Sequence, residues 1–174
     1  MIQPAADIIV FIFVSAAAWW DATAQRIPNT VTVTGLAAAL MLRALVGVDA
    51  FMHGVMGAGI GLLVSLVFYA LRAIGGGDLK LLVGIGGFLG ADEIWGALAV
   101  IAILGAAFAL ASTLRRGVLP LLIYNTMDLV RSLSSLGRAG SPRRLDSAAA
   151  LTIPYGVPIA VGTLIWWFWK GVRL

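Results

Sequence analysis

Two acidic residues, Asp21 and Asp78, each lie where an apolar segment meets a turn. Asp78 directly follows three consecutive glycines, Gly75, Gly76 and Gly77. A charged side chain at membrane depth costs about 2.5 to 3.5 kcal/mol on insertion scales, so a carboxylate in such a position raises a functional question. Glycines beside it permit unusual backbone angles and the close approach of another chain. The stretch therefore predicts a site where a ligand is held against the backbone next to an acid.

Two aspartates that share a water molecule can hydrolyse a peptide bond. The ionised carboxylate takes a proton from the water, and the protonated one donates a hydrogen bond to the scissile carbonyl. Two like charges held close together do not both ionise easily, so the pair divides these roles and titrates as a unit. The substrate must be extended at the cut, because a helix hides its carbonyls in hydrogen bonds. Backbone groups of the glycine turn could pair with such a segment, as an added strand does.

The composition indicates which elements must position these acids. Of the 174 residues, 61% are hydrophobic and 11% are charged, and the mean hydropathy is +1.01. A soluble domain carries about a quarter charged residues. We therefore expect one integral-membrane domain over residues 1–174, an all-α bundle of about six transmembrane helices. The chain has no Cys and a single His53, which excludes thiol catalysis, disulfides, a histidine metal cluster and a Ser/His/Asp triad. We expect no metal, no cofactor and no nucleic-acid partner.

Apolar segments separated by charges or turns define the expected helices. They cover residues 4–20, 31–48, 52–74, 79–91, 94–114 and 148–169. The first has no basic residue before it and ends in a tryptophan pair, which predicts a retained span rather than a cleaved signal peptide. Residues 79–91 would span about 20 Å, less than the hydrocarbon core, and predict a short helix buried among its neighbours. Gly57 and Gly61, in GxxxG spacing, predict close helix contact.

The segment 118–147 differs from the others. Its apolar residues recur at helical spacing, with polar residues between them, and a basic stretch follows. This pattern predicts an amphipathic helix on the cytoplasmic membrane surface, followed by a polar loop.

Basic residues gather on one side of the predicted membrane. They are Arg26, Arg72, Lys80, Arg115, Arg116, Arg131, Arg138, Arg143 and Arg144. The other side holds four acids, Asp7, Asp49, Asp92 and Glu93, with Arg43 near it and Lys170 and Arg173 at the C-terminus. The positive-inside rule makes the first side cytoplasmic and places both termini outside. Asp21 and Asp78 are then expected at the same depth, at the cytoplasmic ends of their helices.

Three motifs, spread from the first span to the last, carry a family resemblance. Gly75-Gly76-Gly77-Asp78 with Lys80 is similar to the GxGDxK signature of intramembrane-type aspartyl proteases. Asp21 with Ile27-Pro28-Asn29 resembles the D-x5-IPN element of type IV prepilin peptidases. Pro154-Tyr155-Gly156-Val157-Pro158 resembles the P-[YF]-G-x-[AP] element of their last helix.

The resemblance implies a concrete function. Prepilin peptidases of the bacterial inner membrane cleave the leader of type IV prepilins and pseudopilins at the cytoplasmic face. By this resemblance Asp21 and Asp78 are the catalytic pair. Residues expected to bind substrate or support the site are Gly75, Gly76, Gly77, Lys80, Pro28, Asn29, Pro154, Tyr155 and Gly156. Longer members carry a CxxC segment and also methylate their product. This Cys-free chain resembles the short, peptidase-only type of tight-adherence or Flp pilus systems, without methyltransferase activity.

Other interpretations stay open at this point. The two carboxylates could relay protons or bind cations in a small transporter or channel subunit, although the spans offer few further polar groups for a route. The chain could also be a non-catalytic component of pilus assembly. Taken singly, Asp78 could be only a helix N-cap. Lys80 could orient Asp78, bind lipid phosphate or extend to the interface, and Tyr155 could pack at a bend.

Overall fold

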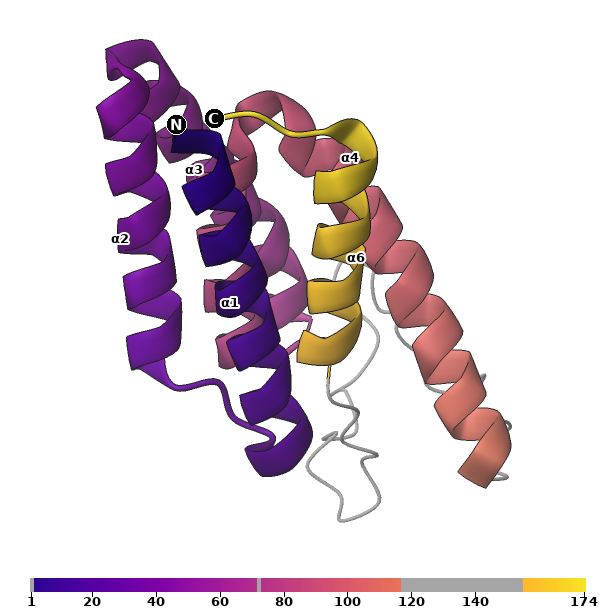
Figure 1. The fold of residues 1–174 in the computed structure, drawn as a ribbon. Helices are drawn as coiled ribbons and strands as arrows, with labels where there is room; N and C mark the ends of the chain where they lie inside the picture. The colour runs from indigo at the N-terminus through magenta and orange to yellow at the C-terminus, as the bar shows by residue number, and fades with distance from the viewer. Residues whose placement is uncertain (1, 72, 117–154) are drawn as a thin grey trace. The chain divides into compact units, whose positions relative to one another are not determined.

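All regular structure in the described residues is α-helical. The computed structural model of the chain describes residues 2–71, 73–116 and 155–174. Their helices are α1 (Ile2–Ala24), α2 (Asn29–Val46), α3 (Val48–Ala70), α4 (Gly76–Arg116) and α6 (Gly156–Lys170), as Figure 1 shows. The all-α prediction is confirmed, whereas the predicted amphipathic helix and loop at 118–147 lie outside the described residues.

The chain divides into two compact units. One consists of Met1–Gly105 together with Pro154–Leu174, and the other is Ala106–Ile153. The first unit contains α1, α2, α3, most of α4 and α6, and it holds both Asp21 and Asp78. Of the second unit, the structure describes the last residues of α4.

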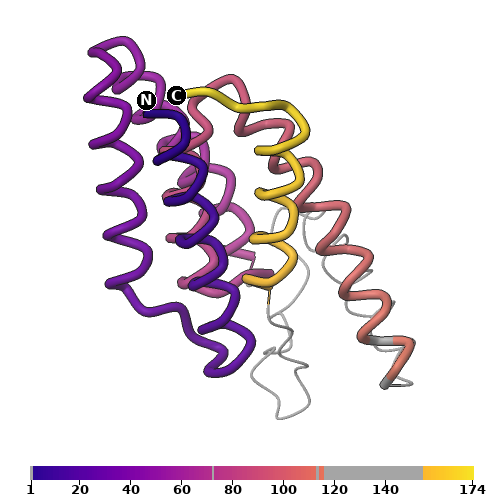
Figure 2. Tube along the Cα trace, in the orientation of Figure 1, coloured from indigo at the N-terminus to yellow at the C-terminus, as the bar shows by residue number. Residues whose placement is uncertain are grey.

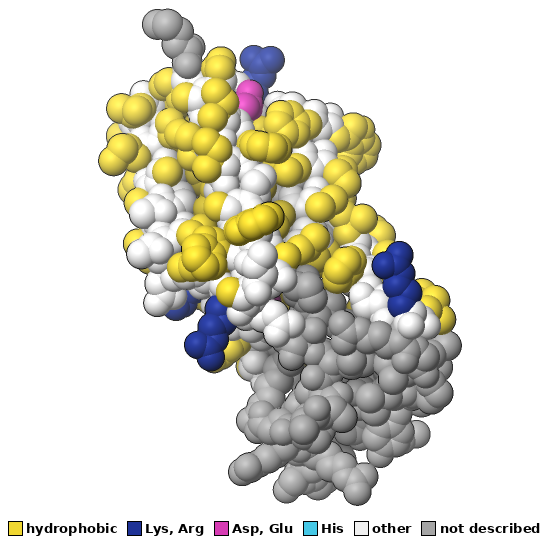
Figure 3. Space-filling view, turned by 60° about the horizontal axis from the view of Figure 1, so that its bottom comes forward, with side chains coloured by type: hydrophobic (Ala, Val, Ile, Leu, Met, Phe, Trp, Pro, Cys, Tyr) yellow, Lys and Arg dark blue, Asp and Glu magenta, His cyan; other side chains and the backbone are white. Residues whose placement is uncertain are grey.

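Several helices have the length and hydropathy of membrane spans. Within the described residues these are Ile2–Ala24, Asn29–Val46, Val48–Ala70 and the part Gly76–Ser112 of α4. Their surfaces expose many large apolar side chains, and Figure 3 shows hydrophobic side chains over the described part of one face with few charges among them. Such a surface suits lipid. With 15 residues, α6 is shorter than these four, and residues 148–154 of the predicted last span lie outside the described part.

A break at Gly90 divides α4 into two helical segments. Gly90 has φ 78° and ψ 179°, which no α-helix contains, and the positive φ favours glycine. Residues 76–89 before the break form a segment of about 20 Å. Most of this segment is buried, with Leu81, Ile85 and Phe88 almost fully covered. The short buried helix predicted at 79–91 is therefore confirmed, although it begins earlier, at Gly76.

Backbone lies directly against backbone where α3 meets residues 76–89. A methyl group on Gly57 would overlap the carbonyl oxygen of Gly86, and one on Gly61 would lie 2.6 Å from the carbonyl oxygen of Leu82. The GxxxG spacing thus produces the close contact that the sequence predicts, because side chains larger than hydrogen would push the helices apart.

The C-terminal helix α6 packs against α1. The four aromatic residues near its end look like an interfacial anchor in the sequence, but Trp167 is buried with 1% of its surface exposed. Its indole N–H donates to Asp7 of α1 over 2.9 Å, while Trp169 stays exposed. Gln3 Nε2 donates to the carbonyl oxygen of Val172 over 2.7 Å, so the two ends of the chain lie side by side, as Figure 2 shows.

Replacing Gly57 by alanine should destabilise the protein, because the new methyl group meets the Gly86 carbonyl and α3 must move away from α4. Overpacking of this kind costs about 1 to 3 kcal/mol. The midpoint of thermal unfolding in detergent should fall. Gly59→Ala on the same helix is the matched control, since a methyl group there meets nothing within 4 Å. An equal effect of both substitutions would contradict the proposed contact.

Candidate active site

Asp21 lies in the last turn of α1 and is held by the way that helix ends. The amide of Gln25 donates to the carbonyl oxygen of Asp21 over 3.0 Å. Gln25 has φ 51°, the left-handed conformation that commonly closes a helix, although glycine usually takes this position. The chain then turns through the buried Ile27 to Pro28, whose extended backbone precedes α2. This turn contains the Ile27-Pro28-Asn29 motif.

Asp78 lies in the first turn of α4 and binds back to the residue before that helix. The amide of Gly75 donates to Asp78 Oδ2 over 3.0 Å, and the amide of Leu79 donates to the Gly75 carbonyl over 3.1 Å. The Gly75 amide is thus occupied and is no free donor for a substrate in this conformation.

The three glycines before Asp78 serve close approach rather than unusual backbone angles. None of them has a positive φ, and Gly76 and Gly77 already belong to α4. A methyl group on Gly77 would lie 3.2 Å from Cβ of Ile27. This contact brings the turn after α1 against the start of α4.

The beginning of α6 contacts Asp21. The amide of Gly156 donates to Asp21 Oδ2 over 2.6 Å. A methyl group on Gly156 would lie 2.8 Å from both Cβ and Oδ2 of Asp21, so only glycine fits here. The neighbouring Tyr155 is close enough to Asp78 for an electrostatic interaction between the two side chains. The predicted partner Pro154 lies outside the described residues.

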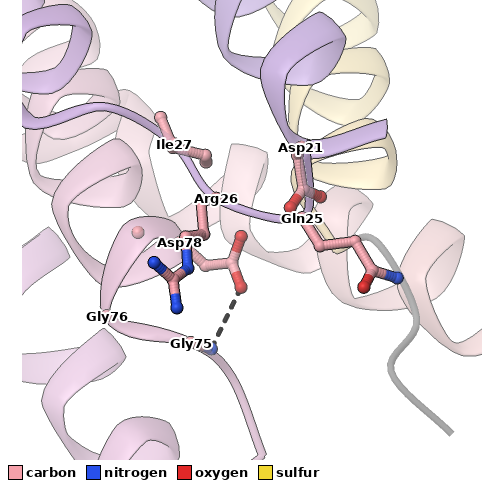
Figure 4. A pocket seen from close by; sticks show the side chains of 8 residues that line it. Asp21, Gln25, Arg26, Ile27, Gly75, Gly76 and Asp78 are labelled. Atoms are coloured by element: carbon pink, nitrogen blue, oxygen red, sulfur yellow. Dashed lines mark hydrogen bonds between the residues drawn. The ribbon is translucent and has the colours of Figure 1, made fainter. Parts of the chain in front are cut away.

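The structure brings Asp21 and Asp78 to one pocket. Its volume is about 260 Å³, and its lining consists of Asp21, Gln25, Arg26, Ile27, Gly75, Gly76, Gly77 and Asp78. Figure 4 shows the two carboxylates entering this space from α1 and from the start of α4. Their side chains interact electrostatically. Only 7% of Asp21 and 8% of Asp78 is exposed, so both acids are largely withdrawn from solvent.

Lys80 and Asn29, both predicted to support the site, contact each other rather than the aspartates. Lys80 Nζ donates to Asn29 Oδ1 over 2.7 Å. This bond joins the start of α2 to the first turns of α4.

Gln25 and Arg26 line the pocket but were absent from the predicted site. The sequence offered one signal for them, their position inside the D-x5-IPN spacing.

Within the described residues, no group of three His, Cys, Asp or Glu side chains could hold a metal ion.

Comparison with known protein families identifies the family of the chain. A model of the type IV leader peptidase family matches residues 8–110, more than half of the chain. The chain belongs to the type IV leader peptidase family. No curated protein and no solved structure matches it. Membership indicates a protease, and the apolar helices fit one embedded in a membrane. The matched range contains both aspartates and the Ile27-Pro28-Asn29 turn but ends before Gly156.

Replacing Gly156 by alanine should reduce peptidase activity, because the methyl group displaces Asp21 and its amide bond. Misplacement of a reacting group by about 1 Å can cost about 100-fold in rate. The rate of leader cleavage by purified protein in detergent would measure the loss. Gly59→Ala serves as the control for adding a methyl group elsewhere. A Gly156→Ala variant with unchanged rate would show that Asp21 does not depend on this contact.

Proposed function

We propose that this protein is an aspartic endopeptidase that removes the N-terminal leader of type IV prepilin-like precursors. The observation that carries the proposal is the shared pocket of Asp21 and Asp78 in a chain of the type IV leader peptidase family. These two acids come from segments far apart in the sequence. The fold places them together, mostly shielded from water, at the ends of apolar helices.

In this proposal a water molecule in the pocket is activated by the pair. One carboxylate accepts a proton from the water while its oxygen attacks the scissile carbonyl carbon. The other carboxyl, protonated, donates to the carbonyl oxygen, and a proton passes to the leaving amine as the peptide bond breaks. In each residue, Oδ2 accepts a glycine amide. Within the described residues no bond occupies either Oδ1, which leaves one oxygen of each carboxylate for water and substrate.

The proposed substrate is an extended segment between a leader and a hydrophobic helix. The substrate must be extended at the cut, because a helix hides its carbonyl groups in hydrogen bonds, and the pocket of the two acids is where the extended segment would lie. The basic residues Arg26 and Lys80 lie near the pocket end of the helices. By the positive-inside rule this end faces the cytoplasm, and we propose a bacterial inner-membrane location with both termini outside.

The proposed type is the short, peptidase-only form, as in tight-adherence or Flp pilus systems. The Cys-free sequence lacks the CxxC segment of the methylating members. A prepilin or pseudopilin precursor is therefore the proposed partner, with no methylation of its new N-terminus.

The buried hydroxyls give the transporter interpretation no support. Thr32, Ser65 and Thr163 each donate to a carbonyl oxygen of their own helix, at Asn29, Leu62 and Ile159 respectively. Hydroxyls bound in this way do not extend a polar route from the aspartates across the described helices.

Substitution of either Asp21 or Asp78 by asparagine should abolish leader cleavage, because an amide can neither accept the proton from water nor share one with its partner. The assay co-expresses the protein with a pilin-like precursor in a host without its own prepilin peptidase and follows the size shift on a gel. Asp49→Asn is the matched control, since Asp49 is exposed in the first turn of α3.

Equal membrane levels of all variants must accompany the result. Cleavage by the Asp21→Asn or the Asp78→Asn variant would contradict the two-aspartate mechanism. If the unsubstituted protein cleaves none of several precursors, the interpretation as a non-catalytic component of pilus assembly is favoured.

A further inference from the structure

Arg43 is a buried cation outside the aspartate pocket. It lies in the last turn of α2 with 4% of its surface exposed. Its guanidinium donates to three carbonyl oxygens: Nε to Gly87 over 2.9 Å, Nη2 to Phe88 over 2.7 Å and Nη1 to Ala50 over 3.3 Å. Within the described residues no carboxylate pairs with it. A buried charge held only by backbone oxygens is costly, so its place in the fold needs a reason.

Two glycines make room for this side chain. A methyl group on Gly54 of α3 would lie 2.5 Å from Cδ of Arg43, and one on Gly90 would lie 2.8 Å from Nη2. The break in α4 at Gly90 and the first part of α3 therefore both leave a space that the arginine fills. The guanidinium is built into the fold rather than resting on it.

Two of the three carbonyls that Arg43 binds, those of Gly87 and Phe88, belong to the end of the segment 76–89, and the third, that of Ala50, belongs to α3. The non-helical residue Gly90 interrupts the hydrogen-bond ladder, so the last carbonyls of this segment lose their usual partners. Unpaired carbonyls inside a membrane protein cost several kcal/mol each. A cation at a helix C-terminus also interacts favourably with the helix dipole. Arg43 thus completes the end of the segment whose other end carries Asp78.

The contact between this segment and α3 offers few side-chain ridges. Ridges of side chains normally lock neighbouring helices in register. Here the contact is made by Gly57, Gly61 and Gly86 with backbone atoms, which form no such ridges. Besides the contact of Phe13 of α1 with Gly84, polar bonds at both ends hold the segment in position. Asn29, the first residue of α2, binds Lys80 at one end, and Arg43, near the last residue of α2, binds the other.

We propose that Arg43 is a positioning residue for Asp78. By holding the far end of residues 76–89, it fixes how far this segment extends toward the pocket, so that α2 sets the position of Asp78 relative to Asp21. The consequence for cleavage rests on the proposed function, whereas the position of the segment does not.

Distances between spin labels test the position directly. The native chain has no Cys, so pairs of introduced cysteines carry the only labels. One pair, Leu63→Cys on α3 and Leu79→Cys beside Asp78, reports on the segment. A second pair, Ile12→Cys on α1 and Ile165→Cys on α6, serves as the reference. Both are measured in lipid nanodiscs in the native background and with Arg43→Met, Arg43→Lys or Arg173→Met.

Arg43→Met should shift the mean distance between labels 63 and 79, or widen its distribution, by about 1.5 Å or more, which is the rise of one helical residue. The distance between labels 12 and 165 should stay unchanged. Arg43→Lys should show a smaller change, because an ammonium keeps the charge but not the planar fork of donors. Arg173→Met, at an exposed arginine, should change neither distance. An unchanged 63–79 distance in Arg43→Met would overturn the proposal. If Arg43→Met does not fold, the Arg43→Lys distance decides in the same way.

Cleavage by the unlabelled variants separates the two proposals. Arg43→Met should lower kcat by about 100-fold, as expected for a displaced catalytic group, with partial recovery in Arg43→Lys. A shifted segment in a protein whose unsubstituted form cleaves no precursor would retain the positioning role and reject the proposed function. If the unsubstituted protein cleaves a precursor but the segment does not move in Arg43→Met, the proposed function is retained and the positioning role is rejected.

Discussion

A short helix that ends inside an apolar protein must satisfy its terminal backbone groups there, and this constraint shapes the whole site. Residues 76–89 begin at the pocket and end at Gly90. At the first end, Asp78 accepts a hydrogen bond from the amide of Gly75. At the second end, Arg43 donates hydrogen bonds to the carbonyl oxygens of Gly87 and Phe88. At each end a side chain meets terminal backbone groups of the helix: Asp78 of the helix itself at the first end, and Arg43 of α2 at the second.

Close backbone packing follows from the same short helix. Because the segment is surrounded by α1, α2 and α3, its neighbours approach it where side chains are absent. The ring of Phe13 from α1 packs against Gly84, and Gly86 packs against Gly57 of α3. These glycines are therefore mainly points of close contact. Among the glycines that the structure describes, positive φ angles occur instead at Gly47, Gly90 and Gly171, where helices end or break.

The sequence predicted the fold class and the common location of the two acids, because both follow from local signals. Apolar length predicts helices, and the distribution of basic residues predicts that Asp21 and Asp78 lie at one end of them. The amide of Gly156 on Asp21 and the bonds of Arg43 could not be predicted in this way. They join residues far apart in the chain, and no periodicity specifies such pairs. Arg43 was interpreted only as a charge near the outer side, and Trp167 as part of an interfacial anchor.

The two carboxylates are held by different parts of the fold, and this bears on how they could work together. Asp21 belongs to α1 and accepts a hydrogen bond from a backbone amide of α6. Asp78 belongs to α4 and accepts a hydrogen bond from a backbone amide of the preceding turn. Within the described residues no hydrogen bond joins them directly. Near the pocket, the two parts meet where Ile27 packs on Gly77. A chain bound in the pocket would contact both parts at once. In the proposed mechanism, binding energy can therefore bring the acids to the separation at which they would share one water.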